Sequence, residues 1–178
     1  MSKGEIGVYR RHRPVSGLLA PKKFGGSSSE THTCLMVLAG YETARSFGVV
    51  DELNPSRLVI LYGVPPRPNL AWRLKWSQSL HKGLRDQWPT AEETVSTLDP
   101  LETLRVLNSY YSYLFADHNL AISPICSKMQ CVACYLMWER YRDVRLVFPL
   151  PVSYLPNRFS HSHGSTFQFT LPSPGAMA

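Results

Sequence analysis

The residues best suited to bind an anion are Ser127 and Lys128, which follow a short apolar run over residues 119–125. We expect this run to be a buried strand and Ser127 to be the N-cap of the helix that follows. The first N–H groups of a helix lack intrahelical partners, and the helix dipole favours negative charge there. The sequence therefore predicts a ligand contact at Ser127, Lys128 and Gln130, with a solvated surface lysine as the alternative for Lys128.

Three cysteines lie around the same helix start, at Cys126, Cys131 and Cys134. Their C-x4-C-x2-C spacing matches a plant-type iron–sulfur pattern, which also needs a fourth cysteine and a loop conformation. Here Cys131 and Cys134 fall inside the expected helix among apolar residues, so we expect buried thiols and no metal. With Cys34 in an expected strand, this usage is typical of a reduced, cytoplasmic protein and not of a disulfide framework.

A second chemical candidate is the pair His161 and His163, which alternate with serines before Gly164. A metal site would need further ligands, so we expect a loop near the ligand site. An alternative function is an enzyme acting on a phosphorylated or nucleotide substrate, with Lys128 stabilising negative charge and either histidine as the acid–base group. The sequence contains no G-x-G-x-x-G fingerprint, nucleophile elbow or paired-carboxylate motif, so it predicts no catalytic residue and no cofactor.

These side chains need a scaffold, and the hydrophobic pattern predicts an α/β domain. We expect a three-layer, Rossmann-like fold with a mainly parallel sheet of about five strands. The expected strands are short apolar or alternating runs, over residues 33–38, 57–62, 94–98, 119–125 and 144–148. The expected helices lie between them, over residues 42–53, 71–88, 100–117 and from 127 to 143. In the second helix, Trp72, Trp76, Leu80 and Leu84 would form one apolar face.

Parallel sheets bind ligands at the carboxyl ends of their strands. The loop after the first expected strand is Gly40-Tyr41-Glu42, and the stiff loop after the second begins at Gly63. Both loops would open on the same edge of the sheet as Ser127 and Lys128. We therefore predict that Gly40, Tyr41, Glu42 and Gly63 complete the ligand site.

The 178-residue chain has a formal net charge of +6, and most of the excess lies at its start. Residues 1–31 hold six basic side chains against two glutamates, and they are rich in Gly, Ser and Pro. We expect them to be a flexible basic arm, in which the cluster over residues 10–13 contacts nucleic acid or an acidic partner, or is a solvated tail. Residues 32–148 would form the domain, and residues 149–178 a Pro-rich extension with an edge strand over 166–171. No apolar stretch is long enough to span a membrane, and the start lacks an apolar signal core.

The order of these elements resembles the CRISPR-associated Rossmann-fold sensor domains, known as CARF domains. Residues 33–63, TCLMVLAGYETARSFGVVDELNPSRLVILYG, are similar to the family's first strand, ligand loop and helix. Residues 122–137, ISPICSKMQCVACYLM, are similar to its later loop with a Ser-Lys step. The resemblance implies a dimer that binds a cyclic oligoadenylate or related nucleotide and passes the signal to an effector in prokaryotic antiviral defence. A third alternative, beside the sensor and the enzyme, is a structural partner with no ligand.

Overall fold

The centre of the fold is a five-stranded sheet in which every pair of neighbouring strands is parallel. The computed structural model describes residues 15–19, 32–151 and 168–170. The strands follow the order β4-β3-β2-β5-β6, so the first strand of the sheet lies in its middle and the chain crosses back after β4. Their bounds are β2 Thr33–Ala39, β3 Arg57–Val64, β4 Thr90–Ser96, β5 Asn119–Pro124 and β6 Arg145–Leu146. The predicted Rossmann-like α/β fold with five parallel strands is therefore confirmed.

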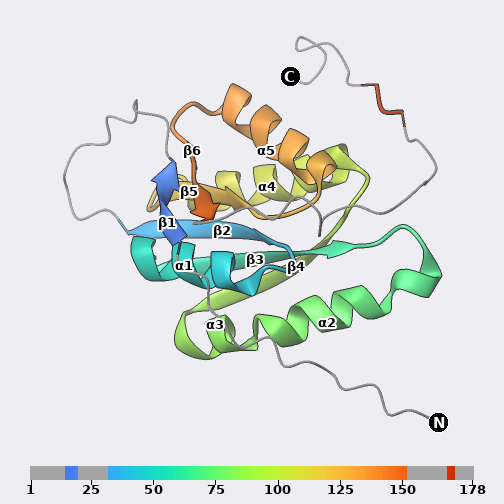
Figure 1. The fold of residues 1–178 in the computed structure, drawn as a ribbon. Helices are drawn as coiled ribbons and strands as arrows, with labels where there is room; N and C mark the ends of the chain where they lie inside the picture. The colour runs from blue at the N-terminus through green and yellow to red at the C-terminus, as the bar shows by residue number, and fades with distance from the viewer. Residues whose placement is uncertain (1–14, 20–31, 152–167, 171–178) are drawn as a thin grey trace.

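Helices cover both faces of this sheet and make the fold three layers thick (Figure 1). One layer contains α1 (Thr43–Leu53), α2 (Trp72–Leu80) and α3 (Lys82–Gln87), and the other contains α4 (Pro100–Leu114) and α5 (Lys128–Arg140). The short 3-10 helix η1 (Pro68–Leu70) precedes α2. In the described residues, no helix is both long and apolar enough to cross a membrane.

The position of β2 in the middle of the sheet explains why its sequence is apolar without alternation. Leu35 and Val37 belong to the core cluster that includes residues of α1 and α3. Met36 and Leu38 belong to the opposite cluster, with residues of α4 and α5. All four side chains have an exposed fraction of 0%. Since successive side chains of a strand point to opposite faces, a strand covered by helices on both sides must be apolar throughout.

Two predicted elements differ from those in the structure. The edge strand β4 begins at Thr90, four residues before the expected start. Its first half carries polar side chains such as the exposed Glu92 and Glu93, so it lacks the apolar pattern on which the prediction depends. The expected helix over 71–88 is divided at His81 into α2 and α3. Its predicted apolar face is buried only in part, since Leu84 is 0% exposed whereas Trp72 and Trp76 are 57% and 51% exposed.

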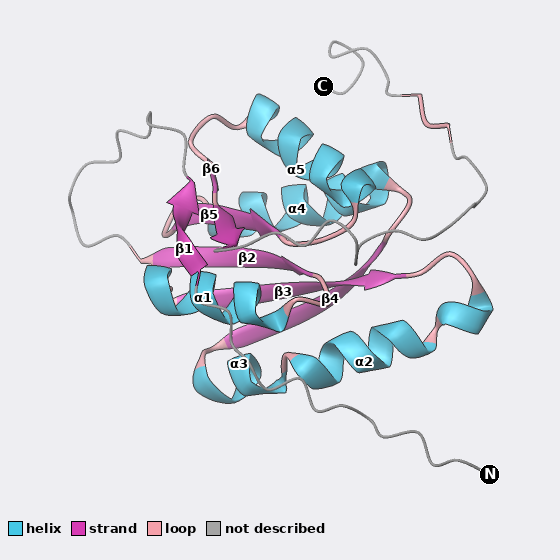
Figure 2. Ribbon diagram, in the orientation of Figure 1, coloured by secondary structure: helices cyan, strands magenta, loops and turns pink. Residues whose placement is uncertain are grey.

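The chain after α5 differs from the prediction as well (Figure 2). The expected strand over 144–148 contributes only β6 to the main sheet, and a separate strand, β7 (Phe148–Pro151), pairs antiparallel with β1 (Val15–Leu19). Part of the expected arm is thus a strand, and both β1 and β7 contact α1. Residues 168–170, within the expected edge strand, are not in a strand. The basic cluster over 10–13, His161 and His163 lie outside the described residues.

Candidate functional site

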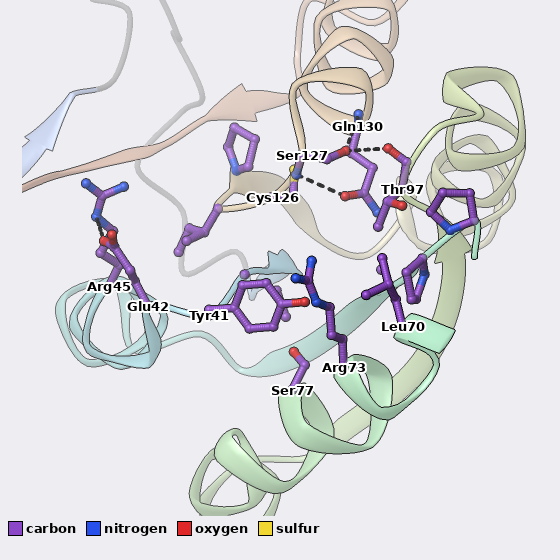
Figure 3. A pocket seen from close by; sticks show the side chains of 17 residues that line it. Tyr41, Glu42, Arg45, Leu70, Arg73, Ser77, Thr97, Cys126, Ser127 and Gln130 are labelled. Carbon is purple, nitrogen blue, oxygen red and sulfur yellow. Dashed lines mark hydrogen bonds and ion pairs between the residues drawn. The ribbon is translucent and has the colours of Figure 1, made fainter. Parts of the chain in front are cut away.

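A cavity of about 490 Å³ opens at the edge of the sheet where the parallel strands end, which we call the carboxyl edge (Figure 3). It lies where β2 is flanked by β3 and β5, and its walls come from the loops after these strands, from α2 and from the start of α5. This is the switch point of the strand order, where open parallel sheets bind ligands. Of the predicted site residues, the structure brings six to this cavity: Gly40, Tyr41, Glu42, Gly63, Ser127 and Gln130.

Two glycines allow the loops to approach one another this closely. A Cβ atom on Gly40 would lie 2.1 Å from the backbone oxygen of Ile125, in the loop after β5. A Cβ atom on Gly63 would lie 2.6 Å from Cγ2 of Thr97 and 3.4 Å from Nε2 of Gln130. Side chains at these positions would push the loops apart, so the shape of the cavity depends on both glycines.

The α5 side of the cavity is held by a capping box. Ser127 Oγ accepts a hydrogen bond from the Gln130 backbone N–H (3.2 Å), and Gln130 Oε1 accepts one from the Ser127 backbone N–H (3.1 Å). Ser127 Oγ also donates to the Thr97 carbonyl oxygen at 2.7 Å. These bonds occupy two backbone N–H groups that the sequence interpretation left free for an anion. They also fix the Gln130 side chain with its amide nitrogen turned away from the helix cap.

Two buried donors at the cavity have no hydrogen-bond partner within the described residues. They are Nε2 of Gln130 and Oγ of Ser77, in residues that are 2% and 5% exposed. A buried polar atom left without a partner costs roughly 1–3 kcal/mol. A ligand with acceptor atoms at these two points would remove that cost, so this pair of donors favours a polar ligand in the cavity.

The α1–α2 side of the cavity carries charge and an aromatic ring. The guanidinium of Arg73, on α2, lies 5.9 Å from the ring centroid of Tyr41, which is 54% exposed (Figure 3). Arg45 is paired with Glu42, with 2.7 Å between Nε and Oε2. No carboxylate pairs with Arg73 in the part of the chain that the structure describes. Because guanidinium groups match phosphate and carboxylate oxygens in geometry, Arg73 is the cation best placed to bind an anion here.

Lys128 does not join this group. It is the first residue of α5 and is exposed, and it is absent from the described residues that line the cavity. Its predicted contact with a ligand stays a prediction.

The sequence interpretation missed Arg73, Ser77 and Thr97, although a signal for the first two exists. Arg73, Ser77 and His81 follow at intervals of four, which places them on one face of a helix. That face points to the sheet, and the tryptophans beside it point outward. Polar residues at helical spacing next to a predicted ligand edge would have indicated a site wall.

His81 explains how this polar face is held. Its side chain is fully buried, with Nδ1 2.8 Å from the Ser77 carbonyl oxygen and Nε2 3.0 Å from Oγ of Ser46 on α1. Burial lowers the pKa of His81 and outweighs the hydrogen bond to the Ser77 carbonyl oxygen, which raises it, and the nearby Arg85 also lowers it. The neutral ring therefore donates to Ser77 and accepts from Ser46, which ties α1 to α2 beneath the cavity.

Cys126 lines the cavity, and its sulfur lies 3.9 Å from that of Cys131. Cys134 is 1% exposed, in the core beneath α5. Within the described residues, no group of three or more His, Cys, Asp or Glu side chains is arranged to hold a metal ion.

Comparison with known proteins finds a likeness in structure but none in sequence. No family model matches the sequence, and no curated protein does. The fold is similar to that of Can2 from Sulfobacillus thermosulfidooxidans, a structure in complex with cyclic tetra-adenylate (cA4), with a TM-score of 0.50 and 16% sequence identity. The resemblance to CARF-type domains is confirmed for the fold. The match covers 66% of this chain and 32% of Can2, so it concerns about a third of that protein.

Proposed function

We propose that this chain is a ligand-sensing module that binds a small anionic ligand, with a nucleotide as the favoured class, in the cavity at the carboxyl edge. The observation that carries the proposal is the convergence of three donors on one cavity: Gln130 Nε2, Ser77 Oγ and the guanidinium of Arg73. A phosphate group would pair with Arg73. The acceptor atoms of a base or sugar would satisfy the amide and the hydroxyl.

The cavity suits a ligand of this kind in size and lining. Its volume of about 490 Å³ falls within the range of small-molecule sites, roughly 300–1,000 Å³. The Tyr41 ring offers a surface for a planar base, since aromatic side chains stack on bases of any sequence. The cavity thus combines a cation, an aromatic face and two directional donors.

The likeness to Can2 supports a nucleotide ahead of other anions, because that protein was solved with cA4. The proposal extends this ligand class to the present chain, together with the biological role that the CARF resemblance implies. In that role the module pairs with a second copy or an effector protein in the cytoplasm and reports a nucleotide signal in prokaryotic defence.

Calorimetric titration tests the proposal, using the whole chain against cyclic and linear oligoadenylates, common mononucleotides and inorganic phosphate. At least one nucleotide should bind, and Arg73→Ala should weaken its binding by roughly 1–3 kcal/mol, as expected for a lost charge-assisted hydrogen bond. Arg105→Ala is the matched control, because Arg105 is an exposed residue of α4 and lies outside the cavity lining. Equal losses in the two variants would place the site elsewhere.

A substitution at Gln130 separates the ligand contact from the helix cap. Gln130→Glu keeps an oxygen to accept from Ser127 and replaces the unpartnered amide nitrogen with an anionic oxygen. It should weaken nucleotide binding at least as much as Arg73→Ala, and it should also lower the melting temperature, because position 130 is only 2% exposed and a charge there is costly to bury. No binding of any anion to the wild-type protein would contradict the proposal and favour the structural partner.

The enzyme alternative is distinguished by recovering the nucleotide after incubation. Among the described residues that line the cavity, Glu42 is the one carboxylate, and it is paired with Arg45. A positioned general base is therefore lacking in the described lining, and we expect the ligand to be recovered unchanged. Conversion at a rate proportional to protein concentration, and lost in Arg73→Ala, would replace the sensor with an enzyme.

A further inference from the structure

We propose that Cys126 and Cys131 are a peroxide-sensitive thiol pair that closes to a disulfide in the wall of the cavity. Their Sγ atoms lie 3.9 Å apart, close enough for either thiol to donate a hydrogen bond to the other. Cys126 belongs to the loop after β5 and lines the cavity, and Cys131 lies in α5. Neither residue is fully buried.

The local structure of the helix start brings the two thiols together. Because Ser127 is the N-cap of α5, Cys126 occupies the position before the cap and Cys131 the fourth position of the helix. Side chains at these two positions often pack against each other as a hydrophobic staple, which fixes how the chain enters a helix. The capping box of Ser127 and Gln130 holds the same turn from the other side. A disulfide here would be a covalent form of a contact that already exists.

The geometry requires little movement for the bond to form. A disulfide has a sulfur–sulfur distance of about 2.05 Å, so the two atoms must approach by roughly 2 Å. Cys126 is a loop residue, and rotation of its side chain with a small shift of the loop can supply this approach. Cys34 and Cys134 are fully or almost fully buried in the core, at 0% and 1% exposure.

The environment of the pair favours Cys131 as the reactive thiol. The hydrogen bond between the two thiols lowers the pKa of Cys131 when Cys126 is the donor, and the same bond, with burial, raises the pKa of Cys126. Burial raises the pKa of Cys34 to about 11 and that of Cys134 well above its ordinary value. The thiolate is the nucleophile, so Cys131 should react first.

The reaction we propose uses hydrogen peroxide as the oxidant. The Cys131 thiolate attacks one peroxide oxygen, the O–O bond breaks, and Cys131 becomes a sulfenic acid while hydroxide leaves and takes up the proton that Cys131 had lost. The Cys126 sulfur then attacks the sulfenic sulfur, its proton leaves with the hydroxyl group, and a second water forms. Two thiols and one peroxide thus give one disulfide and two waters.

Peptide mapping of the wild-type protein tests this directly. The protein is treated with hydrogen peroxide, the remaining thiols are alkylated, and the chain is cut with trypsin. Lys128 lies between the two cysteines, so trypsin separates them and a disulfide appears as two linked peptides. Fragmentation must place the link on Cys131 and not on Cys134, which shares its tryptic peptide. Without peroxide, Cys131 should be alkylated about tenfold or more faster than Cys34 and Cys134.

Three variants sharpen the assignment. Cys126→Ser should leave Cys131 as a sulfenic acid that dimedone traps, Cys131→Ser should give neither product, and Cys134→Ala should form the same link as the wild type. The wild-type map stands even where a variant fails to fold. An intramolecular link from Cys126 to Cys134, no intramolecular link at all, or equal alkylation of Cys131 and the buried thiols would overturn the proposal.

The disulfide would also fix the loop that carries one wall of the cavity. This consequence for ligand binding rests on the proposed function. It is measured by titrating the oxidised and the reduced protein with a nucleotide that binds the wild type and comparing the two affinities. The disulfide itself is detected with no ligand present, so a failure of the thiol pair and a failure of the nucleotide site give different results.

Discussion

The two walls of the cavity are built by different means. On the α5 wall, Ser127 and Gln130 bond to each other, and Ser127 bonds to Thr97. On the α1–α2 wall, Arg73 lies over the half-exposed ring of Tyr41 and has no carboxylate partner within the described residues. One wall is thus a closed set of short-range hydrogen bonds, and the other presents a cation and a ring that a ligand can use.

The two walls would therefore act differently on a ligand, since one positions it and the other attracts it. The α5 wall fixes where a ligand atom must lie, because Gln130 Nε2 has no partner among the described residues and its side chain is held through Oε1 by the capping box. The α1–α2 wall supplies the charge that attracts an anion, and Arg73 can adapt to it. Changes to the first wall should therefore act on folding as well as binding, whereas changes to the second should act mainly on binding.

The largest effect is expected where the walls meet, at Gly40. Gly40→Ala places a methyl group 2.1 Å from the Ile125 backbone oxygen, so the loops after β2 and β5 must separate. We expect a loss of about 3 kcal/mol in the free energy of unfolding, at the upper end for overpacking. Urea denaturation of both proteins measures it.

Gly63→Ala is the matched control for this prediction. Its new methyl group meets Cγ2 of Thr97, the end of a side chain, instead of backbone. A side chain can move more easily, so the cost should be smaller, near 1 kcal/mol. Equal costs for the two variants would mean that the loop after β5 is not fixed against Gly40.

The second effect concerns pH and the support beneath the α1–α2 wall. His81 is buried and its pKa is lowered, so the folded protein keeps it neutral while the unfolded chain gains a proton below its ordinary value of 6.5. The free energy of unfolding should be fully retained above pH 6.5 and should fall as the pH drops below it. The slope from this one group is at most about 1.4 kcal/mol per pH unit.

Denaturation curves between pH 7.5 and pH 5, run on the wild type and on His81→Gln, test this dependence. Glutamine can accept from Ser46 but does not titrate in this range. The difference in unfolding free energy between the two proteins should shrink as the pH falls, because only the wild type pays for excluding the proton. Parallel curves would show that His81 titrates normally and that the tie between α1 and α2 does not depend on its neutral form.

How far the sequence predicts this molecule differs between the same two walls. The parallel sheet and the start of α5 follow from local patterns, since a buried strand and an N-cap depend on neighbouring residues. The position of Arg73 depends on which face of α2 meets the sheet. The sequence interpretation places the tryptophan face on the sheet, and the structure places it toward solvent. The large apolar area of these tryptophans suggested burial, whereas both are about half exposed. The pairing of β1 with β7 joins distant segments, which no local pattern reveals.

The smallest effect is expected at Lys128, which the sequence predicts as a ligand contact and which the structure leaves outside the described cavity lining. The sequence alone places its charge on the ligand, but the side chain is exposed and lies outside the described cavity lining. An exposed charge at this range is screened by salt, so Lys128→Ala should weaken nucleotide binding by less than about 1 kcal/mol. The melting temperature should stay the same or rise slightly, because a lysine opposes the dipole at the start of a helix. Titration at low and high salt, beside Arg73→Ala, measures this. A loss as large as that of Arg73→Ala, and unchanged by salt, would show that Lys128 reaches the ligand directly and that the α5 wall also contributes charge.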